Sequence, residues 1–279
     1  MSMHGVAKSS PLSLSPARRG VRDKCYELDG VDERVDLDAA AAANTIDWDG
    51  SKSWSVSVWF KNPGTSYATL WSVCSTTAAA NRYMEVASFY SGATGKIRFY
   101  GLASTTGGLT LTSPAPSPSG GSGRVDIADS HTNGILPNDG NWHNVILTVN
   151  SAADTVAGLN IYLDGLPAGY AKTAALTNTW DFLKVGCRVQ TNNTSLTQFT
   201  PGLFSKLSIY SSALSAGQVA NVWAGGHSTD ERLLTPAPVN FYRFGNDAAV
   251  FPAAVDIGTG GDDGDGVNME AIDVATDQP

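Results

Sequence analysis

Charged residues are scarce in this sequence, at 16% of the chain, and long apolar runs are absent. Apolar residues still make up 42%, which is too many for a disordered chain, so the sequence can bury a core. No stretch of about 18 apolar residues is present, so no transmembrane helix is expected. The first residues also lack the apolar stretch of about 7–15 residues found in secretory signal peptides. We therefore expect synthesis in a cytoplasm, with no membrane association.

Cysteine is rare as well, with only Cys25, Cys74 and Cys187. An odd count with no metal-binding spacing predicts reduced, buried thiols instead of disulfides or a zinc site.

Basic residues are outnumbered by acidic ones, 18 to 26, which gives a net charge of −8. This acidity argues against nucleic-acid binding.

The two ends of the chain carry opposite charge. Residues 1–24 hold five basic residues against one acidic residue, whereas residues 245–279 hold eight acidic residues and no basic one. The first segment is rich in Ser and Pro and has no apolar period, so we expect an extended arm over 1–24. Such an arm suits contact with an acidic partner surface, and two solubilising ends are the alternative. The predicted partner contacts are Lys8, Arg18, Arg19, Arg22 and Lys24.

Glycine and proline are abundant (29 and 13 residues) and disfavour helices, while short alternating segments predict strands. In Ser53–Phe60, for example, Trp54, Val56, Val58 and Phe60 alternate with mostly polar residues, which predicts a half-buried strand. The other predicted strands are Ala68–Cys74, Tyr83–Tyr90, Lys96–Leu102, Leu109–Leu111, Val125–Ile127, Trp142–Val149, Leu159–Leu163, Phe182–Val189, Leu203–Tyr210 and Val239–Phe244.

One short helix is predicted near residues 215–224, with Ser215 as its N-cap and Gly225 and Gly226 as its stop. Residues 112–123 are rich in Pro, Ser and Gly; a domain linker is one interpretation, but we favour an exposed loop because strands continue on both sides. The predicted fold class is all-β, an antiparallel β-sandwich or jelly roll. Residues 25–279 form its single domain, with 231–279 as an acidic closing segment.

Several segments resemble laminin-G-like, concanavalin A-like jelly-roll proteins, in the order of that family. They are Tyr26–Leu37, Trp54–Phe60, Asp139–His143 (DGNWH), Tyr162–Gly165 (YLDG) and Gly202–Leu214. The resemblance covers about 200 residues and implies the concanavalin A-like jelly-roll fold.

The closing segment resembles a narrower group within this family. Phe241–Asn246 and Val267–Val274 resemble the ends of laminin-G-like proteins of tailed phages. This likeness implies a structural virion protein that decorates or cements the phage head, with the major capsid protein as partner and assembly as an oligomer such as a trimer. The alternative is a glycan-binding adhesin of a phage tail or fibre. A cellular adhesion module is a third interpretation, but the odd cysteine count and the lack of a signal peptide speak against it.

No catalytic residue is predicted. Glucanases of this fold carry a Glu-x-Asp-x-x-Glu pattern on one strand, and none of the five Glu residues here lies in such a pattern. His143 lies in the predicted strand Trp142–Val149, beside the core, and is interpreted as a structural histidine with a satisfied ring nitrogen. We therefore expect no enzyme activity.

The sequence holds candidate residues for two kinds of binding site. Asp262, Asp263 and Asp265 lie in a glycine-rich stretch and are candidate ligands for Ca²⁺, with an acidic surface turn as the alternative. For glycan binding the candidates were aromatic residues and amides, although the sequence does not tell which are exposed. These candidates are Trp48, Trp59, Trp71, Trp180, Asn192 and Asn193; Trp54, Trp142 and Trp223 were expected in the core.

Overall fold

The computed structural model describes residues 24–42, 52–62, 67–74, 83–91, 94–101, 124–127, 137–150, 157–173, 181–190, 193–245, 253–270 and 274–276. Three predicted segments lie outside these ranges: the strand Leu109–Leu111, the loop over 112–123 and nearly all of the arm. Within the described part, the fold consists of two antiparallel β-sheets of eight strands each, a separate two-strand hairpin and two helices. The antiparallel sandwich predicted from the sequence is therefore confirmed.

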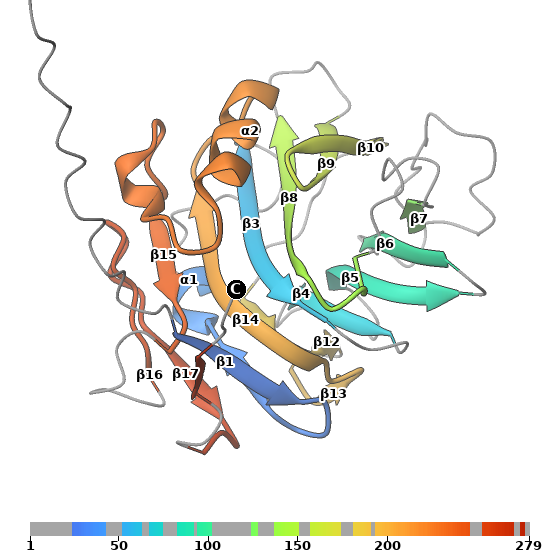
Figure 1. Ribbon diagram of the computed structural model, residues 1–279, viewed down its shortest axis with the longest axis vertical. Coiled ribbons are helices and arrows are strands. Elements are labelled where there is room, and N and C mark those ends of the chain that lie inside the picture. The colour runs from blue at the N-terminus through green and yellow to red at the C-terminus, as the bar shows by residue number, and fades with distance from the viewer. Residues whose placement is uncertain are drawn as a thin grey trace, which may run out of the picture.

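The first sheet, sheet A, is built around the long strand β14. Figure 1 shows β14, β3 and β8 side by side in one layer, with β1 and β15 following one another along the other edge of β14. In order, its strands are β10 (Leu166–Thr173), β9 (Ala157–Leu163), β8 (Trp142–Asn150), β3 (Trp54–Lys61), β14 (Pro201–Tyr210), β1 (Lys24–Asp29) and β18 (Val274–Thr276), with β15 (Asn240–Arg243) also paired to β14.

The second sheet, sheet B, combines strands from the two ends and the middle of the chain. In order, they are β16 (Ala253–Ala254), β17 (Gly264–Val267), β2 (Arg34–Asp36), β11 (Phe182–Val185), β4 (Ala68–Cys74), β5 (Tyr83–Ser91), β6 (Thr94–Gly101) and β7 (Arg124–Ile127). The hairpin of β12 (Arg188–Gln190) and β13 (Ser195–Thr197) is separate from both sheets.

The core lies between the two sheets. Trp54, Val56, Val58 and Phe60 of β3 belong to one buried cluster with apolar side chains of sheet B such as Trp71. The alternation predicted for Ser53–Phe60 is thus confirmed. Its outward side chains are buried as well, and Trp223 of α2 (Ala216–Gly225) packs on Trp59, so residues 54–60 are buried on both faces instead of one.

The helix α2 begins and ends where the sequence predicts. Ser215 is its N-cap and forms a capping box with Gln218, and Gly226 ends it with a φ of 77°. A second helix, α1 (Asp38–Ala42), was not predicted; four of its five residues are alanine, the residue with the highest helix propensity. A short 3₁₀ helix, η1 (Glu231–Leu233), follows α2. None of the helices in the described ranges is both long and apolar enough to cross a membrane.

One predicted strand is divided in two. The sequence predicts a continuous strand over Phe182–Val189, but β11 ends at Val185 and β12 begins at Arg188. Gly186 between them has a φ of 82°, and a Cβ there would lie 2.2 Å from Leu28 Cδ1. Only glycine fits this turn. The turn directs the chain away from sheet B, so β12 pairs with β13 instead.

The chain ends complete both sheets. β1 begins at Lys24, which the sequence analysis assigned to the arm, and Lys24 pairs with Thr276 of β18. β16 and β17 extend sheet B beside β2. The closing segment is thus part of the sandwich, and the strands it adds bring Asp265 next to Asp36.

The three cysteines are free and buried. Burial raises the pKa of Cys74 to about 11 and that of Cys187 to about 12. Both thiols are therefore protonated and weakly reactive near neutral pH, in line with the structural role expected from the sequence.

Candidate functional site

A row of polar residues crosses the outer face of sheet B. Asp265 of β17 is opposite Asp36 of β2, Asp36 is opposite Lys184 of β11, and Lys184 is opposite Ser72 of β4. Ser72 is in turn opposite Glu85 of β5. Directly opposed residues point to the same face of a sheet, so these five side chains form one continuous row.

The strand alternation explains why this row faces outward. Val35 and Leu37 flank Asp36, and both are buried in the core between the sheets. Leu183 and Val185 flank Lys184 and are buried there too. Because side chains alternate along a strand, Asp36 and Lys184 must point away from the core.

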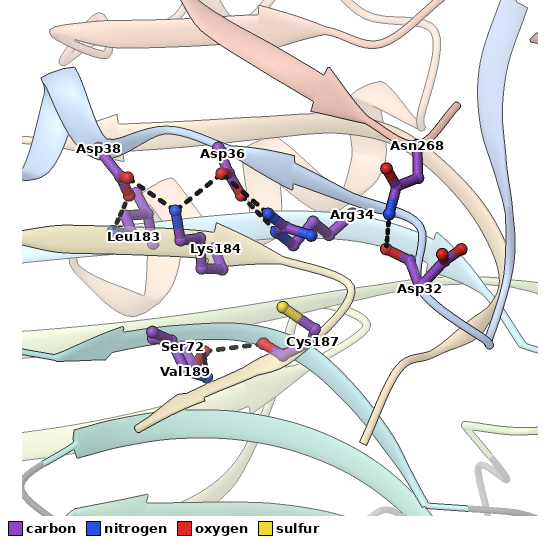
Figure 2. Close-up of polar contacts among 10 residues, drawn as sticks. All are labelled: Asp32, Arg34, Asp36, Asp38, Ser72, Leu183, Lys184, Cys187, Val189 and Asn268. Carbon is purple, nitrogen blue, oxygen red and sulfur yellow. Dashed lines mark hydrogen bonds and ion pairs between the residues drawn. The ribbon is translucent and has the colours of Figure 1, made fainter. Parts of the chain in front are cut away.

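Lys184 lies between two carboxylates. Its Nζ is 2.9 Å from Asp36 Oδ2 and 2.6 Å from Asp38 Oδ2. Arg34 contacts Asp36 from the other side, with Nε 2.9 Å from Oδ1. Figure 2 shows the four side chains in one line, with the positive and negative groups alternating. We call Arg34, Asp36, Lys184 and Asp38 the ionic cluster.

The carboxylates of the ionic cluster are more accessible than its cations. The Lys184 side chain is 1% exposed and that of Arg34 is 15% exposed, whereas Asp36 is 22% and Asp38 is 33% exposed. Burial raises the pKa of Asp38, and its contacts with Lys184 and the Leu183 amide oppose that rise. A ligand that approaches this face therefore meets carboxylate oxygens first, and ionised carboxylates only accept hydrogen bonds.

The hairpin of β12 and β13 covers the middle of the row. Ser72 Oγ donates to the Cys187 carbonyl at 2.8 Å and accepts from the Val189 amide at 2.9 Å, and Ser72 is fully buried (Figure 2). Phe182 and Leu196 pack against the small cluster of Cys74 and Val189 under the hairpin. The hairpin thus bounds the ionic cluster on one side.

A second charged group anchors the hairpin. Arg188 Nε of β12 donates to Glu85 Oε2 at 2.7 Å, and the Arg188 guanidinium lies 5.2 Å from the centre of the Tyr67 ring. Tyr67 and Thr69 also donate to the Glu85 carboxylate, which is fully buried. Glu85 is therefore saturated with hydrogen bonds and serves to hold the hairpin in place.

The predicted calcium ligands lie at two places in the closing segment. Asp262 Oδ2 accepts from Asn240 Nδ2 at 2.9 Å, and Asp263 Oδ1 accepts from the Asp256 amide at 2.8 Å. Asp265 is exposed on β17 next to the ionic cluster. Across the described ranges, no three or more His, Cys, Asp or Glu side chains are grouped so as to hold a metal ion. These residues thus do not fit a ready-made calcium site, and calcium binding stays a prediction.

Of the five basic residues predicted to contact a partner, only Lys24 lies within the described ranges. Lys8, Arg18, Arg19 and Arg22 lie outside the described residues. Lys24 is paired in β1, as stated above. The predicted role of these five residues in partner binding therefore stays a prediction.

The two aromatic candidates for glycan binding within the described ranges are not on the surface. Trp59 is 2% exposed and Trp71 is fully buried, because α2 covers the first and the opposite sheet covers the second. Trp48 and Trp180 lie outside the described residues. Trp54 is buried as expected, but Trp142 and Trp223 are only half-buried.

One of the two amide candidates, Asn193, lies just before β13 of the β12–β13 hairpin. Asn193 is half-buried and has a positive φ of 61°, while Asn192 is outside the described ranges. The ionic cluster was not predicted from the sequence. An alternating Arg34-x-Asp36-x-Asp38 pattern was present, but nothing local indicated Lys184, which is 146 residues from Asp38 along the chain.

A family model described as the concanavalin A-like lectin/glucanases superfamily matches residues 35–220, which is two thirds of the chain. No curated protein sequence matches the chain.

Similar solved structures include a heptameric SAP-like pentraxin from Limulus polyphemus, with 14% identity and a TM-score of 0.49 over 75% of this chain and 85% of the pentraxin. The sialidase domain CBM40 of Ruminococcus gnavus, bound to α2,3-sialyllactose, has 11% identity and a TM-score of 0.48 over 71% of this chain and 96% of the domain. A proposed carbohydrate-binding protein from Bacteroides ovatus has 11% identity and a TM-score of 0.54 over 91% of this chain and 60% of that protein. At these identities the likeness concerns the fold alone.

Proposed function

Because the chain belongs to the concanavalin A-like lectin/glucanase superfamily, we propose that it is a carbohydrate-binding domain without catalytic activity. We assign binding to the outer face of sheet B, at the ionic cluster and the adjoining β12–β13 hairpin. The observation that carries this assignment is the pair of accessible carboxylates, Asp36 and Asp38, which the buried Lys184 holds in place.

Carbohydrate recognition needs fixed hydrogen-bonding groups on an accessible surface. Sugar hydroxyls donate hydrogen bonds, and bonds to ionised carboxylates are stronger than those between neutral groups. The lysine and arginine contacts fix Asp36 and Asp38 before a ligand arrives, which lowers the entropy lost on binding. The polar hairpin beside them adds further groups, including the exposed Thr194 and Thr197.

The same geometry argues for binding instead of hydrolysis. A glycosidase needs one carboxylic acid that protonates the glycosidic oxygen and a second carboxylate about 5–9.5 Å away. Here a single ammonium group contacts both accessible carboxylates, and the buried Glu85 is saturated by Arg188, Tyr67 and Thr69. Both accessible carboxylates thus contact a lysine and the third carboxyl group is buried, which favours binding of a sugar over its hydrolysis.

The sequence also predicted capsid decoration, with the major capsid protein as partner and the virion as location. That prediction depends on the arm and on the resemblance of the closing segment. The matching family model is described by lectins and glucanases, which act on carbohydrates. Carbohydrate binding, the alternative in the sequence analysis, therefore takes its place as the main proposal, and the capsid role stays a prediction.

The test is a glycan array probed with the purified chain, followed by titration calorimetry with the best ligand. We expect binding that falls at least tenfold in Asp38→Asn. The matched control is Glu27→Gln, which removes an exposed carboxylate from β1 of sheet A and should bind as the wild type does. A chain that is folded by circular dichroism but binds no glycan would overturn the proposed function.

A further inference from the structure

The ionic cluster also restricts the charge of the ligand. We infer, resting on the proposed function, that this face takes glycans without acidic groups and rejects sialylated or uronic-acid glycans.

The cations of the cluster are already neutralised. Lys184 Nζ contacts two carboxylates and is almost completely buried. Arg34 contacts both oxygens of Asp36, through Nε at 2.9 Å and Nη2 at 3.5 Å. A ligand carboxylate that approached either cation would meet the Asp36 or Asp38 carboxylate at the same place, and the like charges repel.

The surroundings increase the negative charge. Asp265 is exposed on β17 directly opposite Asp36, so three carboxylates face two cations in this part of sheet B. Beyond the hairpin, the cation Arg188 is paired with the buried Glu85. The hydroxyl groups of an uncharged sugar, by contrast, can donate to all three outward carboxylates.

Lys184 acts here as a positioning residue. Its aliphatic stem is buried against the sheet and its ammonium group holds Asp36 and Asp38 in position. The ligand contacts the two carboxylates and not the lysine. Removal of both negative charges would leave Arg34 and Lys184 without their partners and should reverse the charge preference of the face.

The experiment compares uncharged and acidic glycans on three proteins. Neutral glucan and mannan oligosaccharides, sialyllactose and oligogalacturonate are titrated into the wild type, Asp36→Asn/Asp38→Asn and the control Glu27→Gln. We expect the wild type and the control to bind a neutral oligosaccharide at least tenfold more tightly than either acidic one. The double variant should lose at least tenfold in neutral binding and gain affinity for an acidic glycan.

The outcomes separate this inference from the proposed function. If the wild type prefers sialyllactose or oligogalacturonate, the proposed function stands and the inference is overturned. If no glycan binds to the folded wild type, both are overturned. Thermal melts of all three proteins establish that the variants are folded. If the double variant does not fold, the single variant Asp38→Asn takes its place. In the single variant, a smaller ratio of neutral to acidic affinity supports the inference, and an unchanged ratio contradicts it.

Discussion

His143 Nδ1 lies 2.8 Å from Asp164 Oδ2, which joins the start of β8 to the turn between β9 and β10. The other ring nitrogen, Nε2, lies 3.0 Å from Asp139 Oδ1. Because carboxylates only accept hydrogen bonds, both contacts are satisfied together only when the imidazole carries two protons. The structural role expected for His143 follows from this geometry, and both ring nitrogens take part.

The first prediction is a pH dependence of stability. Burial by itself lowers the pKa of His143, but the hydrogen bonds and charges of Asp164 and Asp139 outweigh it and raise this pKa above its usual value of 6.5. The resulting stabilisation is fully present below about pH 6.5 and is lost as the pH rises through the higher pKa of the folded state. Urea unfolding between pH 5 and pH 9 measures this loss.

His143→Gln is the matching variant. It should lower the free energy of unfolding by about 1–3 kcal/mol at pH 6, because two carboxylates lose their charged partner. It should also flatten the pH dependence above pH 6.5. A variant with the same pH profile as the wild type would show that another group is responsible.

The second prediction concerns Lys184. Lys184→Met keeps the buried stem but leaves Asp38 without its cation and Asp36 with Arg34 alone, so we expect a loss of about 1–3 kcal/mol in the free energy of unfolding. Adding Asp38→Asn to this variant should recover part of the loss, because the negative charge that lost its cation is removed. Lys52→Met, at an exposed lysine, is the control and should have little effect. Equal stability of the two lysine variants would contradict the role of Lys184.

The third prediction concerns the buried pair that holds α2 and η1 on sheet A. Lys206 Nζ lies 2.9 Å from Glu231 Oε1 and donates to the carbonyls of Gly226 and Thr229, and Tyr210 donates to Glu231 Oε2 at 2.6 Å. Tyr210→Phe should cost about 1.5–3 kcal/mol, since a buried bond to a charged group is lost.

Hydrogen exchange locates the effect of Tyr210→Phe. The amides of α2 and η1 should exchange faster in this variant, whereas those of β4 and β5 should not change beyond the global loss of stability. Uniform acceleration over both sheets would mean that the tyrosine does not act locally.

The fourth prediction tests the calcium hypothesis for Asp262, Asp263 and Asp265. If this segment binds Ca²⁺, a chelator lowers the melting temperature of the wild type, and Asp263→Ala abolishes that difference. The comparison is made within each protein, because Asp263 also accepts a hydrogen bond from the Asp256 amide and its removal has a cost of its own. Identical melting curves of the wild type with and without the chelator would contradict calcium binding by this segment.

Much of the fold could be predicted because its signals are local. The predicted strand Ala68–Cys74 coincides with β4, and Ser215 and Gly226 bound α2 as their residue types indicate. Asp164 and Gly165, a residue pair typical of two-residue hairpin turns, both have positive φ values, 51° and 76°. Alternation, caps and turn residues each depend on a few neighbouring residues.

The site could not be predicted in the same way. Lys184 and Asp36 meet because β2 and β11 pair in one particular register, which no local pattern encodes. Trp59 alternates as an outward residue, and the packing of Trp223 from α2, with ring centres 5.2 Å apart, helps to bury it. Exposure of an outward side chain therefore depends on which distant segment covers it.

The most direct test of the central claim is a crystal structure of the chain with the tightest-binding glycan from the array. The account predicts the sugar on the outer face of sheet B, with its hydroxyls within hydrogen-bond distance of the Asp36 and Asp38 carboxylates. A sugar bound elsewhere, with this face unoccupied, would contradict it.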